Sequence, residues 1–293
     1  MITKVLRTAT IGSCALALSA ATAGSVLTGE AMIARRIIGK RKGSSPYADG
    51  LYGQARTGVS LRFAMLGDST AAGYGMADPA HTPGVQLAQA LADQSGRAVR
   101  FRSLAVVGAR SADLHDQVGR TLLFRPHVAV ILIGANDVTH LVPVRSAARA
   151  LGDAVGALTA AGIRVVVGTC PDLRAVRPLY PPLRNVVTRY GAALASAQRA
   201  AVIANGGTPV SLADTLGPAF FADPPTMFGP DRYHPSRIGY QFAAQALLPT
   251  VLTEVAAVPA AGGTAKATVT DLVRYRQSRQ SMAFGDSAEL RTA

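Results

Sequence analysis

The stretch LRFAMLGDST, residues 61–70, decides the fold of this 293-residue chain. Six mostly apolar residues lead into a Gly-Asp-Ser turn, a pattern typical of a buried β-strand that ends in a tight loop. Apolar runs of similar length recur downstream, and turn-forming residues bound them. The five strands that this pattern predicts are 61–66, 99–107, 128–133, 163–169 and 209–212.

Stretches with helical character separate these strands. Short runs rich in Val, Ile and Leu that alternate with helices predict a parallel sheet with both of its faces covered. We therefore expect an α/β fold, with three α/β/α layers around a five-stranded parallel sheet. The expected helices are roughly 84–95, 111–123, 144–161, 183–205 and 236–257.

The two ends of the chain differ from this middle part. Residues 1–7 carry two positive charges, residues 8–29 carry none, and Ala21-Thr22-Ala23 offers a small-residue cleavage site. This order is typical of a secretory signal, although the uncharged stretch is also long enough to span a membrane. The expected parts are a signal peptide or N-terminal membrane anchor (1–31), a basic linker (32–58), one catalytic domain (59–257) and a polar tail, disordered or one surface helix (258–293).

A cleaved signal predicts an exported protein, either secreted or associated with the cell envelope. An uncleaved segment would instead anchor the protein in the membrane. The segment is weakly apolar, which favours cleavage, but five basic residues follow it and two precede it. By the positive-inside rule, that excess on an uncleaved segment would keep the downstream domain in the cytoplasm.

The composition excludes several classes of protein. With 49% hydrophobic and 16% charged residues, the chain is not wholly disordered. The net charge is +13, but the arginines of the central part are scattered with few aromatic residues between them, so we expect no nucleic-acid partner. The basic residues near 35–42 suit an anionic membrane surface. Cys14 and Cys170 are the two cysteines, and no metal-binding spacing is present, so we expect no metal and no cofactor.

Polar residues follow the expected strands at the points where the strands end. Ser69 follows the first strand, Gly108 the second and Asn136 the third, while Asp231 and His234 precede the last helix. Ligands of parallel α/β sheets bind outside the carboxyl ends of the strands. These residues should therefore meet at one edge of the sheet.

Together they are the components of a serine hydrolase. A serine hydroxyl needs a base to take its proton, and a histidine oriented by an acid is the usual base. Ser69, His234 and Asp231 fit these three roles. An oxyanion hole needs fixed N–H donors. The backbone N–H groups of Ser69 and Gly108 and the side-chain amide of Asn136 fit that role.

The motifs resemble those of the SGNH, or GDSL-type, hydrolase family. The chain has Gly67-Asp68-Ser69, Gly108, the block 134–137 (GAND) and the block 231–235 (DRYHP), in the family order over roughly residues 60–257. The resemblance implies a flavodoxin-like fold and the hydrolysis of acyl or acetyl esters, with Asp68 and Asp137 in supporting positions. The second block departs from the family pattern, because residues 103–107 (SLAVV) lack the asparagine that often precedes the glycine.

Two motifs occur twice, so each has a competing copy. Gly-Asp-Ser recurs at 285–287 without a preceding strand, and we interpret that copy as chance. Asp137 and His140 repeat the Asp-x-x-His spacing, but Asp137 directly follows Asn136, so we expect it to brace the loop and favour His234 as the base. Cys170 ends the fourth strand, where a small buried thiol is the expected role.

These residues predict an exported serine esterase that acts on acyl or acetyl esters of lipid or carbohydrate. The alternatives are an acyltransferase on the same site and a non-catalytic envelope protein on the same fold. The sequence does not decide the oligomeric state. Loops at 75–84, 172–182 and 218–230 are expected to give the cleft apolar walls, from Leu179, Tyr180, Phe220, Phe221, Met227 and Phe228.

Overall fold

A computed structural model describes residues 44–54, 59–176 and 179–258. The expected signal or anchor, most of the expected linker and all of the expected tail after Val258 therefore lie outside the described residues. Among the residues that are described, no helix is both long and apolar enough to cross a membrane.

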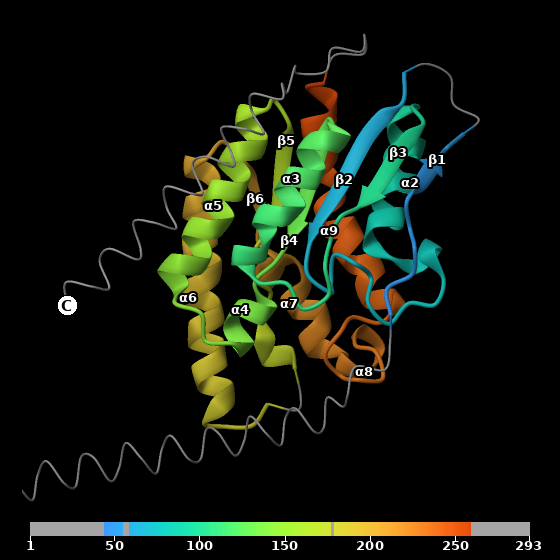
Figure 1. The fold of residues 1–293 in the computed structure, drawn as a ribbon. Coiled ribbons are helices and arrows are strands. Elements are labelled where there is room, and N and C mark those ends of the chain that lie inside the picture. The colour runs from blue at the N-terminus through green and yellow to red at the C-terminus, as the bar shows by residue number, and fades with distance from the viewer. Residues whose placement is uncertain (1–43, 55–58, 177–178, 259–293) are drawn as a thin grey trace, which may run out of the picture.

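The centre of the molecule is a six-stranded sheet with the order β1-β3-β2-β4-β5-β6 (Figure 1). Five strands are parallel, which confirms the predicted α/β fold. The sixth strand, β1, pairs antiparallel with β3, so the sheet is mixed. The strands are β1 (Gly50–Tyr52), β2 (Leu61–Gly67), β3 (Val99–Ser103), β4 (Val128–Leu132), β5 (Arg164–Gly168) and β6 (Thr208–Val210).

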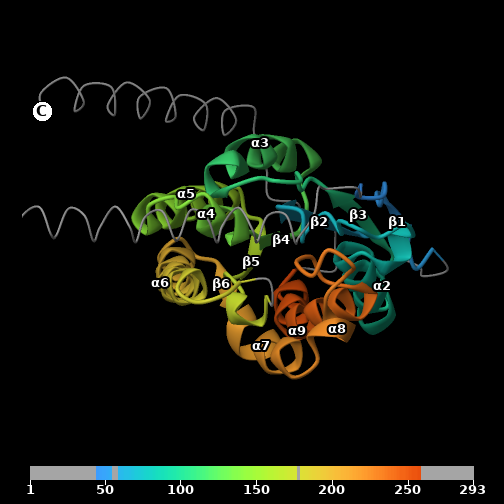
Figure 2. The ribbon, with the colours of Figure 1, turned by 90° about the horizontal axis from the view of Figure 1, so that it is seen from below.

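Helices cover both faces of the sheet, so the three expected layers are present (Figure 2). One face is covered by α3 (Leu114–Phe124), α5 (Val144–Ala160) and α6 (Leu183–Ala204). The other is covered by α2 (Pro83–Ser95), α7 (Leu212–Ala222) and α9 (Arg237–Ala256). Two short helices, α4 (Ala135–Thr139) and α8 (Pro224–Met227), lie near the carboxyl edge.

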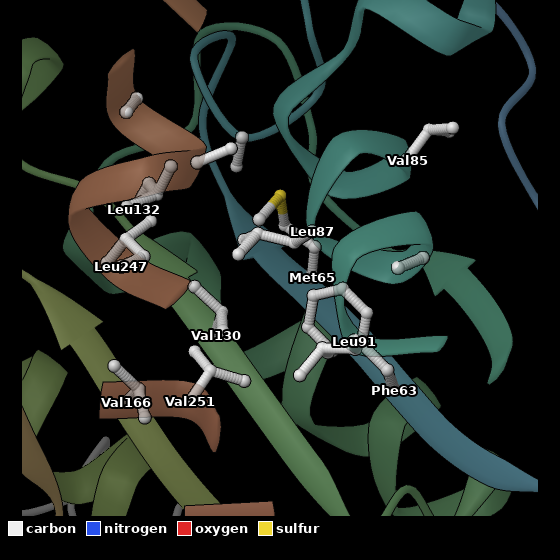
Figure 3. Close-up of a cluster of buried hydrophobic side chains, with 14 of the residues drawn as sticks. Phe63, Met65, Val85, Leu87, Leu91, Val130, Leu132, Val166, Leu247 and Val251 are labelled. Carbon is white, nitrogen blue, oxygen red and sulfur yellow. The ribbon is translucent and has the colours of Figure 1, made fainter. Parts of the chain in front are cut away.

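Alternating strand residues build a core on each side of the sheet. Phe63, Met65, Val130 and Val166 point toward α2 and α9 (Figure 3). Their strand neighbours, such as Ile131, pack against α3 and α5 on the other side. Because both faces are buried, nearly every position of a central strand is apolar: β4 is apolar throughout, and β2 departs from this only at the half-buried Arg62 near its start, which explains why these strands appear in the sequence as mostly apolar runs.

Two expectations about the sheet need correction. The segment expected to be a linker contains the edge strand β1, held because Tyr52 packs 6.2 Å from the ring of Phe101 and Asp49 accepts a 2.8 Å hydrogen bond from Ser103 N–H. The strand expected at 99–107 ends at Ser103. Beyond Ser103, Val106 N–H still donates a hydrogen bond to the Gly67 carbonyl of β2 at 3.0 Å, but the chain no longer has strand geometry.

The segment expected to be a proline-rich loop, 218–230, is mostly helical. Pro218 lies inside α7. Pro224 is in the first turn of α8, where the missing N–H of proline removes no hydrogen bond. Asp223 caps the start of α8, because its side chain accepts a hydrogen bond from Thr226 N–H at 3.3 Å. Proline content alone therefore misled the prediction, because the helix capping residues decide where these helices start.

Candidate active site

The nucleophile turn is formed at a glycine that no other residue can replace without strain. Gly67 has φ +131, and a Cβ atom there would lie 1.8 Å from the carbonyl oxygen of Leu132 in β4. Asp68 N–H then donates to the same carbonyl at 3.0 Å. The close approach of β2 and β4 places Ser69 at the carboxyl edge of the sheet.

The sheet order explains why the sequence-predicted residues meet there. Strands β3, β2 and β4 are neighbours, and the loops after them carry Gly108, Ser69 and Asn136. The chain passes from β2 to β3 on one side and then returns to β4 on the other. Such a reversal opens a crevice at the strand ends, which is where open α/β sheets bind ligands.

Ser69, His234 and Asp231 form a continuous hydrogen-bonded chain. The distance from Ser69 Oγ to His234 Nε2 is 2.9 Å, and the distance from His234 Nδ1 to Asp231 Oδ2 is 2.6 Å. An ionised Asp231 accepts a hydrogen bond from the protonated Nδ1 of His234. Nε2 then carries no proton and accepts the hydrogen bond from the serine hydroxyl. Ser69 and His234 are only 5% and 6% exposed, so the contact is shielded from water.

Asp231 also shapes the loop that carries the histidine. Its Oδ1 accepts hydrogen bonds from the backbone N–H groups of Tyr233 (3.0 Å) and His234 (2.9 Å). Burial would raise the pKa of Asp231, but these bonds and the bond from the histidine ring outweigh burial and lower the pKa below its ordinary value. Asp231 therefore stays ionised and holds one imidazole orientation.

The third-strand loop brings an amide donor to the same edge. Asn136 is 5% exposed, and its Nδ2 donates to the carbonyl of Ala109 at 3.0 Å. An amide nitrogen carries two hydrogens, so this bond fixes the side chain and leaves a second hydrogen for a ligand. Gly108 precedes Ala109 in a turn with φ +87. The bond thus places the Gly108 turn next to Asn136.

Two buried carboxyl groups brace these loops. Asp137 accepts from the hydroxyl of Ser111 at 2.8 Å and from its N–H at 3.1 Å, which ties the third-strand loop to the second-strand loop. Burial raises the pKa of Asp137 and outweighs the Ser111 bonds. Asp68 accepts from Thr70 N–H at 2.8 Å, and its complete burial raises its pKa to about 6.

The imidazole lies between two tyrosine rings that the sequence analysis missed. The ring centroid of Tyr74 is 4.5 Å from that of His234 with a 44° tilt, and Tyr233 makes an edge contact at 5.1 Å. Tyr74 is held from both ends, because its N–H donates to the Ser69 carbonyl and its own carbonyl accepts from the hydroxyl of Tyr240, each at 2.9 Å. No local motif marks Tyr240, which reaches the site from α9.

The competing motif residues lie elsewhere. His140 Nδ1 is 2.8 Å from the Asn136 carbonyl oxygen, at the exposed end of α4, and the structure gives it no contact with Ser69. Cys170 is 1% exposed, and burial raises the pKa of its thiol to about 12, as a structural cysteine requires. The second Gly-Asp-Ser copy, 285–287, lies outside the described residues.

The expected apolar walls are only partly available to a ligand. Phe220 and Met227 are buried in the core, so they line nothing. Tyr180 and Phe221 are 61% and 50% exposed. Phe228 lines a hollow of about 670 Å³ beside the loop that carries Asp231 and His234. Over the described parts of the chain, no group of three His, Cys, Asp or Glu side chains is arranged to hold a metal ion.

A serine, a histidine and an aspartate in contact at the edge of a parallel α/β sheet define a serine hydrolase by geometry. Within that class the chain belongs to the GDSL-like Lipase/Acylhydrolase family, whose profile it matches over residues 65–242. The resemblance to SGNH hydrolases is thereby confirmed, and the protein is an enzyme of the esterase and lipase type.

The sequence is 41% identical over 251 residues to the GDSL-like esterase Rv1075c of Mycobacterium tuberculosis, covering 81% of this chain and 80% of that protein. Among solved structures, TesA matches with a TM-score of 0.56 at 21% identity, covering 66% of this chain and 99% of the other. The psychrotrophic esterase EstA from Pseudoalteromonas sp. matches with a TM-score of 0.53 at 18% identity, covering 67% and 100%. These two likenesses establish the fold.

Proposed function

We propose that the protein is a serine esterase that hydrolyses carboxylic esters through an acyl-enzyme formed on Ser69. The observation that carries the proposal is the unbroken chain from Asp231 to His234 to Ser69, with contacts of 2.6 and 2.9 Å. The intact chain favours catalysis over the alternative of a non-catalytic envelope protein.

In the first half of the reaction, Ser69 Oγ attacks the ester carbonyl carbon while its proton moves to His234 Nε2. The tetrahedral intermediate collapses, the C–O bond to the alcohol breaks, and His234 returns the proton to the leaving alcohol. In the second half a water molecule loses a proton to His234 and attacks the acyl carbon. The bond from that carbon to Ser69 Oγ then breaks, the acid leaves, and His234 returns the proton to Oγ. Ionised Asp231 stabilises the imidazolium in both halves.

The negative oxygen of each tetrahedral intermediate is placed among three donors. These are the backbone N–H groups of Ser69 and Gly108 and the free hydrogen of Asn136 Nδ2. The Ala109 carbonyl holds the Asn136 amide before the substrate arrives, so no reorganisation is needed as charge develops.

We propose acyl or acetyl esters of lipid or carbohydrate as the substrate class. The family description, which joins lipase and acylhydrolase activity, and the esterase name of the 41% identical relative support it. The hollow beside the loop that carries Asp231 and His234 is lined by Phe228 and by prolines such as Pro224 and Pro225, and this lining suits an apolar acyl or aryl group.

The test is a profile of p-nitrophenyl esters from acetate to palmitate, with Ser69→Ala as the inactive variant and Ser287→Ala as the matched control. The wild type and Ser287→Ala should hydrolyse the esters and be labelled by a fluorophosphonate probe, and Ser69→Ala should do neither. Loss of activity in Ser287→Ala alone would overturn the assignment of the nucleophile. Preferential transfer of the acyl group to an added alcohol would replace the hydrolase by the acyltransferase alternative.

We also propose that the enzyme is exported, on the basis of the charged start, uncharged middle and Ala-Thr-Ala stretch of residues 1–23. Mass spectrometry of the native N-terminus tests this proposal. A mature chain that begins after the signal supports export, and an intact Met1 in a membrane fraction favours the anchor.

A further inference from the structure

Two glutamines that the catalytic scheme does not use are buried beside it. Gln117 in α3 and Gln198 in α6 are both fully inaccessible to solvent. A buried primary amide is costly unless its oxygen and its nitrogen both find partners. In each case the partners are backbone groups at the ends of strands, so each side chain holds a strand end in place.

Gln117 binds both polar backbone groups of Gly67, two residues before the nucleophile. Its Oε1 accepts from Gly67 N–H at 2.7 Å, and its Nε2 donates to the Gly67 carbonyl at 2.9 Å. Val106 N–H donates to the same carbonyl at 3.0 Å, so the loop that carries Gly108 is held at the same point.

Gln198 makes a related pair of hydrogen bonds further along the sheet, and here the two bonds join two neighbouring strands. Its Oε1 accepts from Cys170 N–H at 2.7 Å, at the end of β5, and its Nε2 donates to the Ile133 carbonyl at 3.0 Å, at the end of β4. Ile133 is three residues before Asn136. A Cβ atom on Gly134 would approach Gln198 Nε2 to 3.0 Å, so the side chain is packed directly under the oxyanion loop.

Both amides stand where the backbone ladder of the sheet stops. The pairing of β2 with β3 ends at Met65 and Ser103, and the pairing of β4 with β5 ends at Leu132 and Gly168. Beyond these points the regular pairing is incomplete. Val106 N–H still donates to the Gly67 carbonyl, but Gly67 N–H bonds Gln117 where a strand carbonyl would have accepted, and Cys170 N–H and the Ile133 carbonyl bond Gln198. A glutamine amide presents one donor and one acceptor in a plane, as a peptide group does.

We propose that Gln117 and Gln198 are positioning residues, whose side-chain amides replace missing peptide groups of the sheet and thereby fix Ser69 and Asn136 in their catalytic geometry. Gln117 acts through the Gly67 backbone on the nucleophile turn. Gln198 acts through the Ile133 carbonyl on the loop that carries the oxyanion donor. The proposal rests on the esterase mechanism above for its kinetic consequence, and the contacts themselves do not depend on the substrate.

The first experiment is steady-state hydrolysis of p-nitrophenyl acetate by Gln117→Met and Gln198→Met, with kcat expressed per fluorophosphonate-titrated Ser69. Methionine has a similar length and no amide. We expect kcat to fall at least tenfold with less than a threefold change in KM, because the transition state depends most on donor placement. Gln89→Met, at an exposed position of α2, is the matched control and should keep kcat.

A double-mutant cycle separates positioning from general destabilisation. If Gln198 acts through Asn136, Gln198→Met should lower kcat less than twofold in a protein that already carries Asn136→Ala, although it still lowers the melting temperature. An equal fall in kcat in both backgrounds would overturn the role of Gln198. For Gln117, an unchanged rate of fluorophosphonate labelling of Ser69 in Gln117→Met would overturn the role.

Glutamate variants cover the case in which the methionine variants do not fold. A protonated glutamate accepts with one oxygen and donates with the other, but an ionised glutamate cannot donate. The ratio of kcat in Gln117→Glu or Gln198→Glu to that of the wild type should therefore fall as pH rises from about 6 to about 9. A constant ratio contradicts the proposal.

If the wild type hydrolyses none of the esters, the proposed function fails and the inference is decided separately. Hydrogen exchange at the Gly67 and Cys170 amides should then be slow in the wild type and faster in the methionine variants. Unchanged exchange in the variants overturns the bridging role.

Discussion

The buried carboxyl group of Asp68 makes a specific prediction about stability and pH. Asp68 directly precedes the nucleophile, is 2% exposed and accepts from Thr70 N–H at 2.8 Å. Asparagine has nearly the same shape, and its Oδ1 can keep that hydrogen bond. Asp68→Asn therefore removes the ionisation and preserves the turn.

The size of the change in the free energy of unfolding follows from the pKa of Asp68. Burial raises the pKa of Asp68 from 3.8 to about 6, a shift of about two units, and each unit corresponds to about 1.4 kcal/mol. A carboxyl group with a raised pKa stabilises the folded protein fully below pH 3.8, and this contribution is lost as pH rises through about 6. The full contribution is about 3 kcal/mol, of which about 2 kcal/mol is lost between pH ~4 and pH ~7. Relative to wild type, the free energy of unfolding of Asp68→Asn should therefore increase by about 2 kcal/mol over this range.

The assay is urea unfolding of the wild type and Asp68→Asn at several pH values in this range. The difference between the two proteins reports on Asp68 together with its charge interactions with His234 and Asp137, because the other titrating groups are common to both. Asp231→Asn is the control, since the pKa of Asp231 is lowered and its stabilising contribution is lost only as pH falls below the ordinary value of 3.8. A difference between wild type and Asp68→Asn that does not change with pH would refute the burial argument.

The remaining predictions concern catalysis and are measured by steady-state kinetics on a p-nitrophenyl ester. His234→Ala should lower kcat by on the order of 10⁴-fold or more, and His140→Ala by far less; the reverse order would assign the base to the wrong loop. Asn136→Ala should lower kcat by on the order of 10²–10³-fold, about 2.7–4 kcal/mol, with little change in KM, and Asn136→Asp should be at least as damaging. Near-wild-type kcat in Asn136→Asp would remove this amide from the oxyanion hole. Tyr74→Phe keeps the ring against the imidazole and should stay within about threefold of wild type, whereas Tyr74→Ala should lose about tenfold in kcat; equal loss in both variants would show that the ring contact is not what matters.

The sequence by itself determined the layers of the fold and the residues of the candidate site. Apolar runs that end in turns are a local signal, because a strand buried on both faces is apolar at nearly every position. The chemistry of ester hydrolysis likewise constrains side-chain type, so Ser69, Asn136, Asp231 and His234 could be named from motif order alone. The family comparison confirms the class that these motifs indicated.

The local signal failed where a partner element decides the structure. The edge strand β1 exists because Tyr52 and Asp49 meet residues of β3 about fifty positions away, and a three-residue strand has no periodicity of its own. The helices of 212–227 are set by the caps Ser211 and Asp223, whereas their prolines suggested a loop. Capping and packing therefore overrode composition.

Only the tertiary structure decided which histidine meets the nucleophile and what surrounds the two. Ser69 and His234 are 165 residues apart, so the 2.9 Å contact depends on strand order and on the path of the last loop. The raised pKa of Asp68 and the bridges of Gln117 and Gln198 have the same origin. Burial and hydrogen bonds between distant strand ends depend on three-dimensional neighbours, and a one-dimensional pattern of residue types does not encode which neighbours those are.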